Sequence, residues 1–142
     1  MAELEAERAE TQVVVHHLGG ARYLGENARG DRTVIDASPD LALGMKPMET
    51  LLASLAACSA IDVVSIMEKR KTPLRAYRIE LSGRRASEHP KRFEEIVVHH
   101  IASGEGVTED QLERAAQLSG EKYCSVAASL NARLIIQVTV DR

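Results

Sequence analysis

Cys58 and Cys124 are the residues of this chain best suited to covalent chemistry. A thiolate is a strong nucleophile, and two thiols that lie close together can cycle between a dithiol and a disulfide. Two cysteines are too few for the disulfide scaffold of a secreted protein. In a reducing compartment such a pair is more often catalytic, redox-active or simply buried. The spacing of the two residues does not establish by itself that they meet.

Cys58 lies near the middle of a long apolar stretch with helical spacing, and its neighbours one turn away are polar. Ser54 and Asp62 precede and follow it by one turn, which makes a thin polar line on an otherwise apolar helix. Polar groups on a buried helix need partners, and a reactive site is one way to supply them. The alternative is an inert cysteine packed among small residues, which is the commoner case for a buried cysteine taken alone.

Cys124 stands at the start of the last helical pattern, close to Lys122. A helix N-terminus and a nearby cation both stabilise a thiolate. A carboxylate such as Asp62 instead raises the pKa of a thiol one turn away. These arguments predict that Cys124 ionises more easily than Cys58, although packing of an inert Cys124 beside Tyr123 is again the alternative.

The elements that must position these residues follow from hydrophobic periodicity and turn signals. Strands are predicted at residues 11–18, 21–26, 32–35, 74–82, 93–101 and 134–140, and helices at 48–70, 108–119 and 123–130. Gly19-Gly20 predicts a hairpin turn, and Thr108 with Gln111 predicts a capping box. The order βββ-α-ββ-αα-β groups its strands, which is typical of the α+β class. Residues 1–10 are predicted to be a flexible N-terminal segment, and residues 11–142 a single domain.

The predicted helix at 48–70 is apolar on nearly every side, which is typical of a fully buried helix. A chain of 142 residues can hardly cover such a helix all round. We therefore expect an obligate homodimer that buries far more than the standard interface of about 1,600 Å².

Composition excludes several classes of partner. The formal charge of −3, with 18 basic and 21 acidic residues, argues against binding of nucleic acid. The acidic N-terminal segment resembles no targeting signal, and the apolar stretch at 51–61 is too short to span a bilayer. We therefore expect a cytoplasmic protein without a membrane partner.

No phosphate-binding loop or dinucleotide fingerprint is found, so no cofactor is expected. The pairs His16-His17 and His99-His100 lie on predicted strands, where adjacent side chains face opposite sides. Neither pair can chelate a metal as a unit, and exposed or cross-strand histidines are expected instead.

Two segments resemble a known family. Residues 47–58 read Pro-Met-Glu-Thr-Leu-Leu-Ala-Ser-Leu-Ala-Ala-Cys, and residues 122–126 read Lys-Tyr-Cys-Ser-Val. Together with Ser59 to Val64, they resemble the OsmC/Ohr family of osmotically induced and organic-hydroperoxide-resistance proteins, in its OsmC-like branch. The resemblance spans residues 13–141. It implies the OsmC-like fold, in which antiparallel sheets wrap around central helices within an intertwined homodimer.

The resemblance also implies an activity in oxidative-stress defence. Cys58 would attack a small organic hydroperoxide, Cys124 would resolve the product as a disulfide, and an external dithiol would reduce it. An arginine from the N-terminal strands assists in this family. Arg22 is the best match by region, with Arg29 and Arg32 as rivals.

The chain departs from the family pattern at the start of the helix. The family's hydroperoxidases have a glutamate directly after the helix proline, where this chain has Met48. Glu49 follows one position later, about 100° round the helix, and Asp62 adds a second carboxylate near Cys58. The departure favours an alternative function as a non-catalytic, stress-related binding or structural protein, whereas the presence of both cysteines favours the peroxidase.

Overall fold

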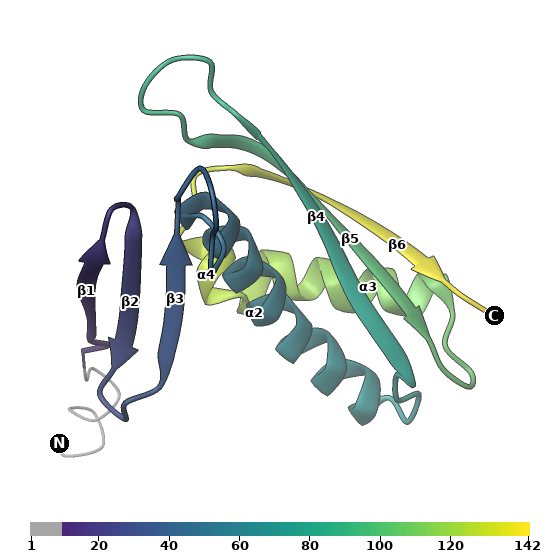
Figure 1. Ribbon diagram of the computed structural model, residues 1–142. Coiled ribbons are helices and arrows are strands. Elements are labelled where there is room, and N and C mark those ends of the chain that lie inside the picture. The colour runs from purple at the N-terminus through teal and green to yellow at the C-terminus, as the bar shows by residue number, and fades with distance from the viewer. Residues whose placement is uncertain (1–9) are drawn as a thin grey trace, which may run out of the picture. The chain divides into compact units, whose positions relative to one another are not determined.

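The computed structural model describes residues 10–142, which form parts of two compact units, Met1–Thr50 and Leu51–Arg142. Apart from Glu10, the predicted flexible segment lies outside the described residues. The order of elements is βββ-α-ββ-α, a π-helical turn, then α-β, and the α+β class is confirmed (Figure 1). A single domain over residues 11–142 stays a prediction.

The N-terminal unit contains an antiparallel sheet of three strands in the order β1-β2-β3. These are β1 (Val13–Gly19), β2 (Arg22–Asn27) and β3 (Arg32–Asp36). The first hairpin turns at Gly20-Ala21, one residue later than predicted, because Gly19 still belongs to β1 beyond a shift of register. Gly19 and Gly20 have φ angles of 112° and 54°, which glycine adopts without steric cost.

The second unit contains a three-stranded sheet in the order β4-β5-β6. Its strands are β4 (Ala76–Arg85), β5 (Phe93–Ser103) and β6 (Arg133–Val140). β4 and β5 are antiparallel, but β5 and β6 are parallel, which departs from the antiparallel sheets that the family resemblance implied. A parallel pair requires a crossover connection. That connection consists of α3 (Glu109–Leu118), the π-helical turn η1 (Ser119–Tyr123) and α4 (Ser125–Ala128).

The long helix α2 (Pro47–Lys69) begins at the end of the first unit and continues through the second. Its predicted bounds are confirmed to within one residue. Its fully buried positions form one stripe with a period of four residues: Leu55, Ser59, Val63 and Met67. Val63 and Met67 pack in a core with residues of α3 and of the β4-β5-β6 sheet, and Figure 1 shows both helices beside that sheet.

The remaining faces of α2 are only partly covered within this chain, as expected of a single copy. Ile61, for example, is 71% exposed. Only 22% of the most apolar part of α2 is buried, and by length and composition alone the helix could cross a membrane. The shortness of residues 51–61 therefore does not exclude a bilayer span, because α2 extends well beyond that stretch. Core helices of soluble proteins can be equally long and apolar. The absence of a membrane partner therefore stays a prediction.

Candidate active site with two thiols

α2 positions Cys58 about midway along its length, with its side chain half-buried. The helix begins at Pro47, where a missing N–H is tolerated because the first turn has no intrahelical acceptor. The Glu49 carboxylate accepts a hydrogen bond from the Lys46 backbone N–H at 2.9 Å. Glu49 therefore closes the start of α2, in the manner of the back-bonding residue of a capping box.

Cys124 is positioned by an unusual turn at the end of α3. The helical backbone does not end at Gly120 but continues as the π-helical turn η1. The Cys124 N–H donates to the Ser119 carbonyl at 2.8 Å. Cys124 is then the N-cap of the short helix α4, and its Sγ accepts from the Ala127 N–H at 3.4 Å. Its side chain is buried, with 3% of the residue exposed.

The thiols of Cys58 and Cys124 lie close enough to interact. The pKa of Cys124 is raised above its ordinary value, first because the thiol is buried and then because it interacts with Cys58. The N–H groups of Ala127 and Val126 act in the opposite direction but do not prevail. The prediction that Cys124 ionises easily at a helix N-terminus is therefore wrong, and Cys124 keeps its proton.

Asp62 has a partner that sequence reasoning did not assign to it. The Ser119 hydroxyl donates to the Asp62 carboxylate at 2.8 Å and lies 3.3 Å from the Ser59 hydroxyl. Ser119 is completely buried, and Ser59 is 5% exposed. The polar line on α2 signalled that a partner was needed, and Ser119 follows the apolar face of α3, but nothing in the sequence joined the two.

A cavity of about 430 Å³ begins one turn along α2 from Cys58. It is lined by Asp62, Ser65, Ile66, Lys69, Arg70, Leu118 and Tyr123. Tyr123 directly precedes Cys124, and Asp62 lies one helical turn after Cys58, so the wall of the cavity includes a residue near each cysteine. Apolar side chains line part of this cavity and two cations lie at the end of α2.

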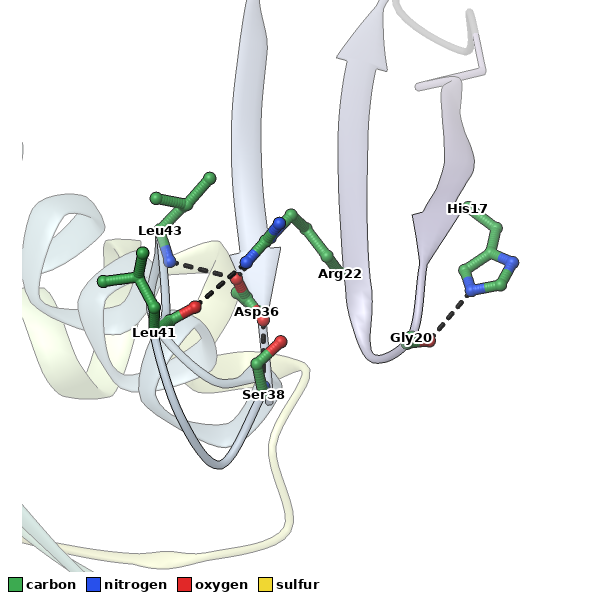
Figure 2. Close-up of polar contacts among 7 residues, drawn as sticks. All are labelled: His17, Gly20, Arg22, Asp36, Ser38, Leu41 and Leu43. Atoms are coloured by element: carbon green, nitrogen blue, oxygen red, sulfur yellow. Dashed lines mark hydrogen bonds and ion pairs between the residues drawn. The ribbon is translucent and has the colours of Figure 1, made fainter.

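Arg22 forms an ion pair within the N-terminal unit (Figure 2). Its Nε donates to Asp36 at 2.8 Å and its Nη2 to the Leu41 carbonyl at 2.9 Å. Asp36 is buried, and it also accepts from the N–H groups of Ser38 and Leu43. The pKa of Asp36 is held well below its ordinary value, chiefly by Arg22.

The rival arginines are also paired within this unit. Arg29 contacts Asp31 at 2.6 Å, and Arg32 contacts Glu26 at 2.8 Å. All three arginines belong to the N-terminal unit, whereas both cysteines belong to the other. A role for Arg22 at the thiols therefore stays a prediction.

Three of the five histidines contact neighbouring strands or turns. His17 contacts the Gly20 carbonyl, His99 contacts Thr139 on β6, and the buried His100 contacts Tyr77 on β4. Within residues 10–142, no three side chains of His, Cys, Asp or Glu gather in a group that could hold a metal ion.

The model of the family described as OsmC-like protein matches residues 38–139. This chain belongs to the OsmC family. Among curated proteins similar to this chain, Protein YhfA of Escherichia coli K12 is 39% identical over 120 residues, which cover 84% of this chain and 88% of YhfA.

Solved structures confirm the OsmC-like fold. A hypothetical protein from Aquifex aeolicus VF5 is 33% identical, with a TM-score of 0.78 over 94% of this chain and 99% of that one. The organic hydroperoxide resistance protein OhrB of Bacillus subtilis is 14% identical, with a TM-score of 0.63 over 93% of this chain and 99% of OhrB. At that identity the likeness to OhrB concerns the fold alone.

Proposed function

We propose that this OsmC-like protein is a thiol-dependent peroxidase that reduces small organic hydroperoxides through Cys58 and Cys124. The observation that carries the proposal is the contact between the two thiols, one from α2 and one from the end of η1. Thiols in contact can form a disulfide with little rearrangement. The name of the structural relative OhrB supports the same reaction class.

The reaction balances with two thiols and one peroxide. The Cys58 thiolate attacks one oxygen of the O–O bond, the bond breaks, and the other oxygen leaves as an alcohol after it takes up a proton. Cys58 is then a sulfenic acid. The Cys124 sulfur attacks the Cys58 sulfur, water leaves and a disulfide forms. An external dithiol reduces this disulfide and is itself oxidised.

The accessibility of Cys58 and the protonation of Cys124 both support an attacking role for Cys58. Cys58 is half-buried, so a peroxide can reach it, whereas Cys124 is 3% exposed. The raised pKa of Cys124 keeps its proton in place while Cys58 reacts. A resolving thiol can lose this proton later, when the sulfenic acid has formed beside it.

Peroxide consumption by the purified protein tests the proposal. We expect turnover of cumene hydroperoxide and tert-butyl hydroperoxide, and slower turnover of hydrogen peroxide, because the nearby cavity is partly apolar. Each peroxide is assayed with dithiothreitol and with a lipoyl dithiol. If no peroxide is consumed with either reductant and both thiols remain reduced, the peroxidase proposal is excluded.

One observation favours the second candidate, a non-catalytic OsmC-like binding or structural protein of the stress response. Met48 occupies the position of the family's glutamate, and the adjacent Glu49 is engaged with the Lys46 N–H at the start of α2. A carboxylate held there is not at the family's usual position. Retention of both cysteines in mutual contact is the reason to place the peroxidase first.

The proposal includes a cytoplasmic homodimer. α2 exposes Ile61, and β1 exposes Val13, Val14 and Val15 by 62%, 57% and 56%. Apolar surface of this extent is typical of an interface. Light scattering at micromolar concentration is expected to give the mass of a dimer. The Ile61→Asp variant is expected to dissociate more readily, whereas the matched Ile61→Leu variant is not.

A folded wild-type monomer under these conditions would contradict the homodimer. Partition of the wild-type protein into lipid vesicles would contradict it as well, because α2 would then be covered by lipid instead of by a second copy.

A further inference from the structure

We infer that Asp62 and Ser119 form a positioning pair that holds the resolving thiol of Cys124 against Cys58. This inference rests on the proposed function, because resolution matters only if the two cysteines form a redox couple. Neither Asp62 nor Ser119 takes part in the chemical step. Their role is to fix the turn that carries Cys124.

Ser119 connects α2 to Cys124 through two different groups. Its hydroxyl donates to the Asp62 carboxylate at 2.8 Å, one helical turn from Cys58. Its backbone carbonyl accepts from the Cys124 N–H at 2.8 Å. A short chain of contacts therefore leads from Cys58 along α2 to Asp62, then to Ser119 and Cys124.

The geometry of η1 explains why such an anchor matters. A π-helical turn contains an additional residue compared with an α-helical turn and is found mostly as a single turn, frequently at functional sites. Successive residues of an α-helix are rotated by about 100°. Relaxation of η1 to α-helical geometry would therefore turn Cys124 by a similar angle away from its present direction. A fixed Ser119 opposes that change.

Burial strengthens the anchor. Ser119 is completely buried, and hydrogen bonds that a carboxylate accepts are stronger than those between neutral groups. Ser59 lies 3.3 Å from the Ser119 hydroxyl and provides a second polar neighbour on α2. Removal of the hydroxyl would leave the Asp62 carboxylate without its partner from η1 and would free the turn to move.

The consequence is a high effective concentration of Cys124 at Cys58. An intramolecular disulfide forms more readily when the attacking thiol is held in place, since less conformational freedom is lost. Loss of the positioning pair should therefore disfavour the Cys58–Cys124 disulfide without changing the access of peroxide to Cys58.

Equilibration of the purified protein with reduced and oxidised dithiothreitol tests this directly. The Ser119→Ala and Asp62→Leu variants are expected to lower the effective concentration of the thiol pair about tenfold or more, which corresponds to roughly 30 mV. Asp62→Asn keeps an acceptor oxygen for Ser119 and is expected to retain most of the wild-type value. Ser125→Ala, an exposed position next to Cys124, is the matched control and should equal the wild type.

Circular dichroism identifies the temperature range in which each variant is folded, and the comparison is made there. If Asp62→Leu does not fold, Ser119→Ala decides alone, because it removes a single oxygen atom. Wild-type values in folded Ser119→Ala protein would overturn the inference. An effective concentration in Asp62→Asn as low as that in Asp62→Leu would also overturn the inference. The charge of Asp62, and not its hydrogen bond with Ser119, would then be responsible for the effect.

The equilibrium requires no peroxide, so it separates this inference from the proposed function. If the wild type does not consume peroxide, the proposed function is excluded, but the effect of Ser119 on the thiol pair can still be measured. In a functional peroxidase, the Ser119→Ala variant, which keeps the charge of Asp62, should show a longer-lived Cys58 sulfenic acid and an unchanged rate of its formation. If the sulfenic acid forms and is resolved more slowly in the variant, the result would indicate general structural damage and would contradict a positioning role.

Discussion

Replacement of Cys58 by serine is expected to reduce peroxide turnover by roughly 10³-fold or more, because the remaining thiol, Cys124, is buried away from peroxide. A hydroxyl ionises far less readily than a thiol and is a poor nucleophile toward an O–O bond. Replacement of Cys124 by serine should leave the first oxidation of Cys58 intact and prevent intramolecular disulfide formation. The two variants therefore separate attack from resolution.

A sulfenic-acid trap distinguishes the two roles. Each reduced variant is treated with one equivalent of organic hydroperoxide, and the labelled residue is identified by mass spectrometry. Label is expected on Cys58 in the Cys124→Ser variant and little label in the Cys58→Ser variant. Label mainly on Cys124 would reverse the assigned roles, and label on neither residue would favour the non-catalytic alternative.

Acid is expected to destabilise the protein through His100. This side chain is completely buried, and its Nδ1 contacts the Tyr77 hydroxyl at 2.6 Å. Its Nε2 has no hydrogen-bond partner within the described part of the chain. Burial, and then repulsion from His99, lowers the pKa of His100 to about 4. Burial raises the pKa of Tyr77, so no phenolate is available to balance a protonated His100.

The sign of the effect follows from linkage. The unfolded chain protonates this histidine near pH 6.5, whereas the native protein does so only near pH 4. The contribution to stability is therefore complete above about pH 6.5 and is lost as the pH falls toward 4. The loss is on the order of 3 kcal/mol in the free energy of unfolding.

Urea unfolding between pH 7 and pH 4, at one fixed protein concentration, measures this effect. The reference is the double variant Tyr77→Phe with His100→Leu, which removes the hydrogen-bonded pair together and leaves the carboxylates unchanged. The free energy of unfolding should fall more steeply with acid in the wild type than in the double variant. Equal pH dependence in both proteins would contradict the assignment to His100.

Local patterns predicted most of the elements. Pro47 and the cations that follow Glu68 bound α2 closely, because a helix start tolerates proline and a helix end favours positive charge. The capping box between Thr108 and Gln111 is confirmed, with both reciprocal hydrogen bonds present. These features depend on residues that lie within one turn of each other, which is why the sequence alone determines them. The two cysteine segments also identified the OsmC family.

Tertiary structure decided the parallel pairing of β6 with β5, the π-helical turn, and the hydrogen bond between Ser119 and Asp62. It also decided the protonation of Cys124. The sequence placed this thiol at a helix N-terminus and so predicted easy ionisation, but burial, together with the interaction with Cys58, raises the pKa of Cys124 despite the backbone N–H groups. The common physical reason is that each of these features depends on groups far apart in the chain. Their distances and burial are set by packing, and local pattern carries no information about either.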